Sequence, residues 1–200
     1  RVTIEGAANH AGTTPTALRH DAGLAAAKVN VFLRQLVEKS GGVATVGCIE
    51  FKPNAINVIP SKAVFTVDLR NPDKEKLDND EKILAAYLKD LAKEDDVKIS
   101  TERLTEFDPV PFDEGIVEKV EKAAKAHGLS VRRITSGAGQ DAQMIARICP
   151  TAMIFVPSVK GISHNPEEYT KDEDVLAGAG VFLDVVMDMA VVGVPAARNN

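Results

Sequence analysis

The feature of this sequence that most constrains its fold is an alternation of strand-like and helical segments over about the first hundred residues. Residues 1–6 alternate polar and apolar side chains with the two-residue period of a strand. Two longer segments repeat apolar side chains at helical spacing. The expected strands are residues 1–6, 44–51, 63–69 and 97–104, and the expected helices are residues 21–39 and 71–93. The order β-α-β-β-α-β predicts a ferredoxin-like domain.

A domain boundary is expected at residues 107–111, where two prolines and two nearby aspartates interrupt every periodicity. The sequence therefore predicts one domain over residues 1–107 and a second over residues 108–200. In the second part we expect helices at 115–127, 140–148 and 172–190, and strands at 130–134 and 151–156. Two strands with helices make half a sheet, so the fold class is α/β (α+β) with an incomplete second domain.

Composition narrows the functional classes. The apolar content of 44% and charged content of 26% are ordinary for a globular protein, and the net charge of −5 argues against nucleic acid or an anionic membrane as a partner. Two cysteines without a CxxC motif exclude a disulfide framework and a zinc ribbon. With no leader-like or membrane-spanning run, we expect a cytoplasmic protein or a piece of one.

The side chains that can carry chemistry gather in four short motifs. These are Asn9-His10-Ala11-Gly12, Asn57-Val58-Ile59-Pro60 with Asp68-Leu69-Arg70, Ser136-Gly137-Ala138-Gly139-Gln140-Asp141-Ala142-Gln143, and Gly161-Ile162-Ser163-His164-Asn165-Pro166. Glycine lets a backbone approach a small ligand closely, and an imidazole can hold a metal or move a proton. Together the motifs are typical of a catalytic site.

Each histidine motif has a functional and a structural interpretation. His164 follows the apolar run 151–156, and ligands gather at the carboxyl ends of strands in open α/β sheets. Its imidazole suits Zn, Mn, Co or Ni, although a surface histidine in a turn is the alternative. His10 lies in a turn rich in glycine and threonine, where it either acts on a substrate or caps the turn.

The polar motifs also leave alternatives open. Arg70 at a strand end can hold a substrate carboxylate bidentately, or it can bridge Asp68 or Asp73. Asn57, expected beside Arg70, can bind the same carboxylate or support the turn into Val58. The turn around Gly137 and Gly139 can present amides to an anion at a helix start, or it can be an ordinary strand-to-helix turn.

These four motifs, in this order and with plausible spacing, resemble the N-carbamoyl-L-amino-acid hydrolases and their relatives, the allantoate amidohydrolases and beta-ureidopropionases. Each motif alone is weak evidence, and four in register are strong. The resemblance implies a subunit with a catalytic domain that binds two divalent metal ions and a smaller lid domain that forms a homodimer. Residues 1–107 would be the lid, and residues 108–200 the C-terminal part of the catalytic domain. Most metal ligands and the general base would lie outside this chain.

The resemblance also implies a role for each candidate residue. His10 would stabilise the oxyanion in the partner subunit's active site, and Asn57 and Arg70 would bind the substrate. Gly137, Gly139 and Gln140 would line the substrate site, and His164 would ligate one metal ion. Gln140 stands where the family commonly has histidine, and its amide can form hydrogen bonds but cannot carry a proton.

The resemblance implies metal-dependent hydrolysis of the carbamoyl C–N bond of an N-carbamoyl-L-amino acid or a related ureido acid such as allantoate. The expected partners are this small molecule and a second copy of the chain, with no nucleic acid and no membrane. Two alternatives remain open. One is a non-catalytic dimerisation module, and the other is an aminoacylase or dipeptidase of the same fold.

Overall fold

The structure is a computed structural model that describes residues 1–192. Its contacts divide the chain into two compact units, Arg1–Pro109 (unit 1) and Val110–Asn200 (unit 2). The boundary between the two units along the sequence falls within the segment rich in proline and aspartate. The mixed α/β class is confirmed. The assignment of the units to a lid and to part of a catalytic domain stays a prediction.

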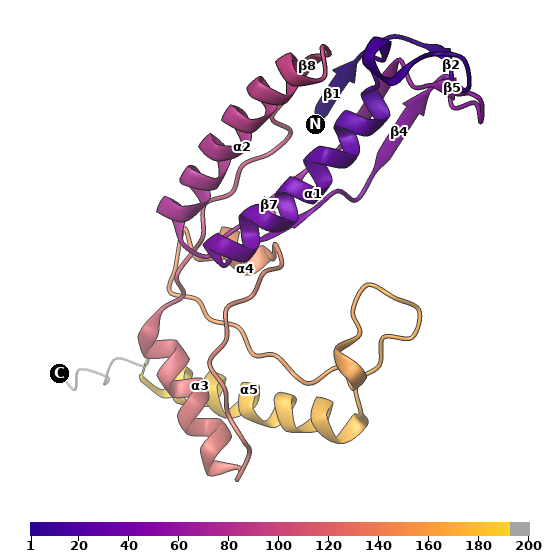
Figure 1. The fold of residues 1–200 in the computed structure, drawn as a ribbon. Coiled ribbons are helices and arrows are strands. Elements are labelled where there is room, and N and C mark those ends of the chain that lie inside the picture. The colour runs from indigo at the N-terminus through magenta and orange to yellow at the C-terminus, as the bar shows by residue number, and fades with distance from the viewer. Residues whose placement is uncertain (193–200) are drawn as a thin grey trace, which may run out of the picture. The chain divides into compact units, whose positions relative to one another are not determined.

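Unit 1 contains the elements of the expected β-α-β-β-α-β order, with additional short strands (Figure 1). The helices are α1 (Ala22–Ser40) and α2 (Lys74–Glu94), with a short 3-10 turn at Thr16–Leu18. The strands are β1 (Val2–Glu5), β2 (Asn9–His10), β3 (Val43–Thr45), β4 (Ile49–Lys52), β5 (Val58–Ile59), β6 (Lys62–Phe65), β7 (Asp68–Arg70) and β8 (Lys98–Thr101).

The core of unit 1 lies between one sheet and its two long helices. The sheet has the order β4-β6-β1-β8 with antiparallel neighbours, and α1 and α2 run side by side against it (Figure 1). Alternate residues of β1 and β6 point toward the helices, so Val2, Ile4, Ala63 and Phe65 are buried in the core. Burial of this apolar surface is the main force that stabilises unit 1.

The two expected strands at residues 44–51 and 63–69 are each divided in the structure. Ile49 pairs with Phe65 and Thr45 with Asp68, so three residues on the first strand (46–48) face two on the second (66 and 67). One extra residue on one strand is typical of a β-bulge, which bends the strand and increases its twist. The bulge separates the β3–β7 pair, which carries Arg70, from the four-stranded sheet.

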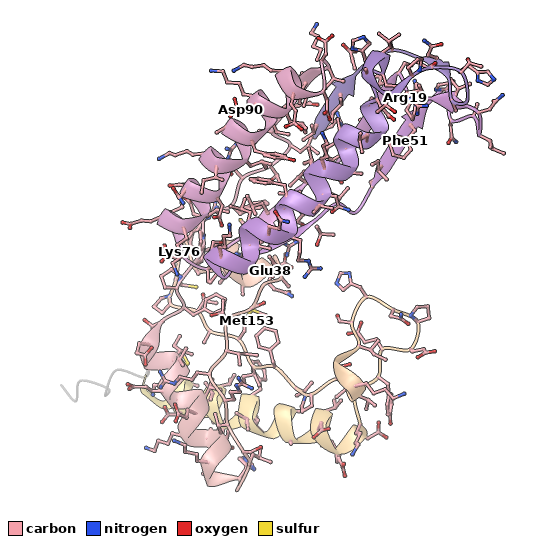
Figure 2. The ribbon with its side chains drawn as sticks, in the orientation of Figure 1. Arg19, Glu38, Phe51, Lys76, Asp90 and Met153 are labelled. Carbon is pink, nitrogen blue, oxygen red and sulfur yellow. The ribbon has the colours of Figure 1, made fainter. Side chains whose placement is uncertain are left out.

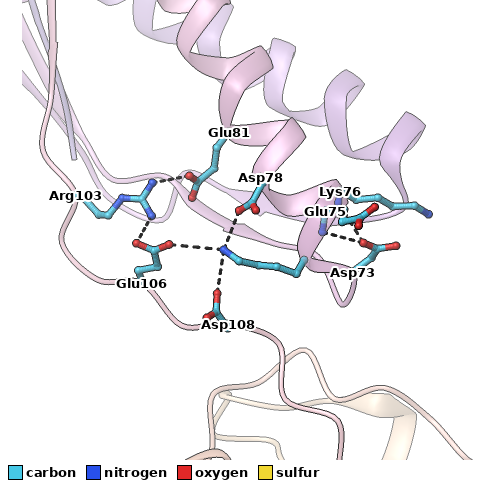
Figure 3. A network of polar contacts seen from close by, with 9 residues as sticks. Asp73, Glu75, Lys76, Asp78, Glu81, Arg103, Glu106 and Asp108 are labelled. Atoms are coloured by element: carbon cyan, nitrogen blue, oxygen red, sulfur yellow. Dashed lines mark hydrogen bonds and ion pairs between the residues drawn. The ribbon is translucent and has the colours of Figure 1, made fainter.

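Ion pairs hold the end of unit 1 against α2. They are formed by Lys74, Asp78, Glu81, Arg103, Glu106 and Asp108 (Figure 3). The Lys74 Nζ lies 2.8 Å from an Asp78 oxygen on the same helix and 2.9 Å from an Asp108 oxygen after β8. Hydrogen bonds to Asp78 and Asp108 raise the pKa of Lys74, which stays charged at every physiological pH. The segment 103–108 thereby follows the surface of α2.

Unit 2 is built from α3 (Glu114–Ala126), α4 (Asp141–Ile145), a 3-10 turn at Val159–Gly161 and α5 (Asp172–Val192). Helices α3 and α5 pack against each other. Over residues 1–192, none of the helices combines the length and apolar character needed to cross a bilayer.

The strands expected at residues 130–134 and 151–156 do not form. Within residues 110–192, neither segment takes part in a ladder. A strand depends on a neighbour to satisfy its N–H and C=O groups, and apolar sequence alone does not supply that neighbour. The Asp113 N–H donates a backbone hydrogen bond to the Thr151 carbonyl at 2.9 Å, but this bond is not part of a ladder.

Candidate functional site

The hydrogen bonds of His10 determine what its side chain can do. Pairing of β2 with β5 places His10 opposite Val58. Its Nδ1 accepts hydrogen bonds from the backbone N–H groups of Gly12, at 3.0 Å, and Thr13, at 3.2 Å. A ring nitrogen that accepts hydrogen bonds carries no proton, so this network assigns the proton of the neutral imidazole to Nε2. His10 therefore caps its turn, as the structural alternative predicts, and its exposed ring keeps Nε2 as a hydrogen-bond donor.

The loop that carries His10 is fixed by two side chains. The buried Thr14 donates its hydroxyl to the His10 carbonyl at 2.7 Å. Arg19, labelled in Figure 2, donates from Nε to the Thr14 carbonyl at 3.0 Å and from Nη2 to the Ala11 carbonyl at 2.7 Å. These hydrogen bonds hold the backbone on both sides of the turn, and they therefore fix the position of His10.

Asn57 lies close to His10 in the structure. The Ala11 N–H donates to the Asn57 carbonyl at 2.9 Å, directly beside the β2–β5 pair. The expectation that Asn57 lies beside Arg70 is wrong, because Arg70 belongs to the separate β3–β7 pair. The structure therefore brings His10 and the exposed Asn57 to one end of unit 1.

Arg70 forms the structural ion pair that the sequence left open. Its Nε donates to Asp68 Oδ1 at 2.8 Å and its Nη2 to Asp68 Oδ2 at 2.6 Å, a bidentate arrangement. These hydrogen bonds lower the pKa of Asp68 and raise that of Arg70. Asp73, the other candidate partner, instead caps α2 through the Glu75 and Lys76 N–H groups. Both members of the pair are about half exposed.

Strand β2, which carries His10, and strand β7, which carries Arg70, lie toward opposite ends of α1 (Figure 1). Near the start of the helix, the Ala22 N–H donates to the Pro60 carbonyl, one residue after β5. Just beyond the end of the helix, Gly42 packs against the Arg70 carbonyl. The 19 residues of α1 span about 28 Å at 1.5 Å per residue. One copy of unit 1 therefore cannot place both side chains on one small substrate.

In unit 2, Gly137, Gly139 and Gln140 lie in the exposed loop that leads into α4. Neither glycine has a positive φ, and a Cβ at Gly139 would meet only the Gln143 side chain, at 3.8 Å. The backbone of this chain therefore does not itself require glycine at either position. Gln140 is the N-cap residue, and its N–H donates to Gln143 Oε1 at 3.3 Å.

His164 occupies an exposed loop with an unusual backbone. Its φ is 55°, in the left-handed region that non-glycine residues rarely adopt. Its N–H donates to Glu168 Oε2 at 2.7 Å, and the Ser163 hydroxyl donates to Glu168 Oε1 at 3.5 Å. Glu168 thus stabilises the turn through the backbone of His164.

The described residues do not make a metal site on their own. Across residues 1–192, no three His, Cys, Asp or Glu side chains lie close enough to share an ion. A catalytic metal ion takes about three protein ligands. His164 offers one, so this part of the chain does not fit the pair of ions that the resemblance implies.

Sequence reasoning missed the residues that hold the candidate side chains. Thr14 and Arg19 support the His10 loop through main-chain carbonyls, and no pattern of residue types marks such contacts. Asp68, by contrast, is one of the two structural partners that the sequence predicts for Arg70. Its signal was present, because residues two apart on a strand share a face.

The sequence profile of the peptidase family M20/M25/M40 matches residues 4–188. The chain is 40% identical to an N-carbamoyl-L-amino-acid amidohydrolase of Rhizobium meliloti, over 94% of the chain and 46% of the relative. It is 37% identical to an allantoate amidohydrolase of Escherichia coli, again over 94% and 46%.

Solved structures give the same result. A hydantoinase/carbamoylase family amidase from Burkholderia multivorans matches with a TM-score of 0.90 and 38% identity, over 94% of this chain and 46% of that one. The chain therefore spans about half the length of the relatives it matches.

Proposed function

The chain belongs to the peptidase family M20/M25/M40, and from this membership we propose that it contributes to an amidohydrolase that cleaves the carbamoyl C–N bond of a ureido acid. Relatives named as N-carbamoyl-L-amino-acid and allantoate amidohydrolases support a ureido group as the substrate feature. From an N-carbamoyl-L-amino acid, water would release the free amino acid, ammonia and carbon dioxide.

The observation that carries this proposal is the fixed donor at His10. Addition of water to the carbamoyl carbon converts its carbonyl oxygen into an oxyanion. A hydrogen-bond donor held ready for that oxygen stabilises the transition state without reorganising. The contacts of Nδ1 with Gly12 and Thr13 leave the proton on Nε2, which is the group such a role needs.

The remaining candidates would bind the rest of the substrate. Arg70 would hold the carboxylate, oriented by Asp68, and Asn57 would hydrogen-bond the ureido group near His10. Gly137 and Gly139 would let the backbone approach the ligand, and Gln140 would donate or accept a hydrogen bond without carrying a proton.

A site that uses both His10 and Arg70 would draw them from two copies of the chain. The length of α1 separates the two side chains within one copy by more than a small ureido acid can bridge. This separation supports a homodimer in which His10 of one copy meets Arg70 of the other. The lid role of unit 1 is part of the same proposal, and the cytoplasmic location stays a prediction.

The family is generally metal-dependent, and His164 would supply one ligand to one of two divalent ions, Zn, Mn, Co or Ni. Most of the other ligands would lie outside this chain, since no three potential ligands cluster among the described residues.

The proposal is tested by ammonia release from N-carbamoyl-L-amino acids and allantoate by the metal-loaded enzyme that contains this chain, with N-acetyl-L-amino acids as the competing class. We expect ureido substrates to be cleaved and His10→Ala to lower kcat by about two to three orders of magnitude. The control is His20→Ala, since the His20 Nδ1 contacts the Asp96 carbonyl outside the site. Cleavage of N-acetyl substrates alone would indicate an aminoacylase, and no cleavage of any of them would contradict the proposal.

The dimer is tested by mixing two inactive variants, His10→Ala and Arg70→Ala. If one site takes its histidine and arginine from different copies, half of the mixed dimers' sites keep both groups. An equal mixture that exchanges freely should then recover about a quarter of the wild-type activity. If both groups act from one copy, the mixture stays inactive.

A further inference from the structure

A buried carboxyl group near Arg70 has no role in the folding or function described above. Asp80, on α2, is 1% exposed. Its Oδ1 is buried and has no hydrogen-bond partner in the part of the chain that the structure describes. Its Oδ2 accepts one long hydrogen bond, from Asn71 Nδ2 at 3.5 Å.

Stability alone gives a weak reason for this group. Burial of a carboxyl group is unfavourable unless hydrogen bonds replace those it made with water. One long hydrogen bond replaces few of those made with water. An apolar side chain of similar size at this position would make the folded state more stable. The position of its partner gives a second reason for the group.

Asn71 directly follows Arg70 and is itself 5% exposed. While its Nδ2 donates to Asp80, its Oδ1 accepts from the Asp73 N–H at 3.1 Å. Asp73 is the N-cap of α2. The Asn71 side chain therefore fixes the turn between β7 and α2 from both sides.

The backbone of Arg70 is enclosed at the same point. A Cβ at Gly42 would lie 2.6 Å from the Arg70 carbonyl oxygen and 3.1 Å from Asn71 Nδ2, so the Gly42 backbone packs closely on both. Across the β3–β7 pair, Arg70 faces Val43. A shift of Asn71 would therefore be passed to the backbone of Arg70, because the two residues are covalently adjacent and the Gly42 backbone packs closely on both.

We propose that Asp80 is a positioning residue, which acts through Asn71 to fix the end of β7 and thereby the direction of the Arg70 guanidinium. Asp68 holds the guanidinium itself, and Asp80 holds the backbone from which that side chain extends. The inference rests on the proposed role of Arg70 in binding the substrate carboxylate.

The first test observes Arg70 without a substrate. In the full chain, the Arg70 Nε–Hε resonance is followed by ¹⁵N NMR in Asp80→Ala, Asp80→Asn and Asp90→Ala. We expect Asp80→Ala to shift or broaden the resonance. Asp80→Asn should restore it, because an amide oxygen also accepts from Asn71. Asp90, which lies on the outer side of the same helix and pairs with Lys93, is the matched control and should have no effect (Figure 2).

The second test follows catalysis with N-carbamoyl-L-alanine by the metal-loaded enzyme that contains this chain. Loss of the Asp80 contact should raise KM by about three- to tenfold, as expected for a lost hydrogen bond, with little change in kcat. Asp80→Asn should return KM toward the wild-type value. A merely structural role would lower the amount of folded protein and leave the KM of the folded fraction unchanged.

A third variant keeps the test decisive if Asp80→Ala does not fold. Asn71→Ala breaks the same link from the other side and should shift the same Arg70 resonance. Where both single variants fold, their effects should be non-additive in the double variant. An unchanged Arg70 resonance in Asn71→Ala or Asp80→Ala would overturn the inference. If the resonance moves but neither Asp80→Ala nor Arg70→Lys alters KM, Arg70 does not bind the substrate, and the proposed role fails while the positioning stands.

Discussion

Asp68 and Arg70 form an ion pair in which each side chain shifts the pKa of the other. The hydrogen bond from Arg70, and then the charge of Arg70, lower the pKa of Asp68 against the opposing effect of desolvation. The folded-state pKa thus lies below the unfolded value of 3.8. The pair therefore stabilises the folded state above that value, and the contribution is lost as the pH falls below 3.8 through the folded-state pKa.

Replacement of Asp68 by asparagine should remove this pH-dependent contribution. Because both side chains are about half exposed, we expect a loss of only about 0.2–1 kcal/mol of unfolding free energy near neutral pH. The difference from wild type should vanish below the folded-state pKa. Urea unfolding of the wild type and the variant, at neutral and at strongly acidic pH, measures the difference in unfolding free energy at each pH. A difference that is equal at the two pH values would show that the pair is not the cause.

Sequence reasoning identified the candidate residues but not all of their neighbours. It proposed Asp68 and Asp73 as structural partners of Arg70, and the structure selects Asp68, since residues two apart on a strand share a face. It placed Asn57 beside Arg70, whereas the two-residue pairing of β2 with β5 places Asn57 beside His10. Pairing between strands this short and this far apart in sequence leaves no periodic signal.

At the scale of elements, helices were predicted better than strands. The helix expected at 21–39 is α1 at Ala22–Ser40, because Asp21 caps its start and Gly41, with a φ of 80°, ends it. Capping residues such as these can be recognised directly from the sequence. The strand expected at 151–156 is absent, because its existence depends on a neighbouring strand that local sequence does not specify.

The segment after β8 should be released when its ion pairs to α2 are removed. Lys74 and Arg103 connect α2 and residues 103–108 across exposed surface (Figure 3). In a Lys74→Ala, Arg103→Ala double variant, we expect faster amide hydrogen exchange over residues 103–108. High salt should produce part of the same effect in the wild type, since exposed ion pairs are screened. Hydrogen exchange with mass spectrometry measures the change.

The control for this prediction is Lys93→Ala. Lys93 pairs with Asp90 at the other end of α2 and forms no ion pair with residues 103–108 among those described. Its removal should leave exchange in that segment unchanged. If the double variant also leaves the exchange rates unchanged, the backbone alone holds the segment.

At the scale of the molecule, the two units differ in how completely they bury apolar surface. Unit 1 encloses a continuous core between its sheet and helices. In the described part of unit 2, the buried apolar side chains are Ala124, Val181 and Val185. An open apolar cavity of about 540 Å³ lies between α3, α5 and the segment 152–156, with Ile116, Met153 and Phe182 in its wall.

This difference predicts that a hydrophobic dye such as 8-anilinonaphthalene-1-sulfonate binds the folded chain mainly at unit 2. Isolated apolar side chains on a surface are ordinary, whereas a contiguous apolar face is a binding surface. Phe182 and Leu18 provide a matched pair, because they are 62% and 65% exposed but only Phe182 lines the cavity. Phe182→Ser should lower dye fluorescence strongly, and Leu18→Ser should leave it near the wild-type value. Equal effects of the two substitutions would mean that total apolar exposure, rather than the unit 2 cavity, governs binding.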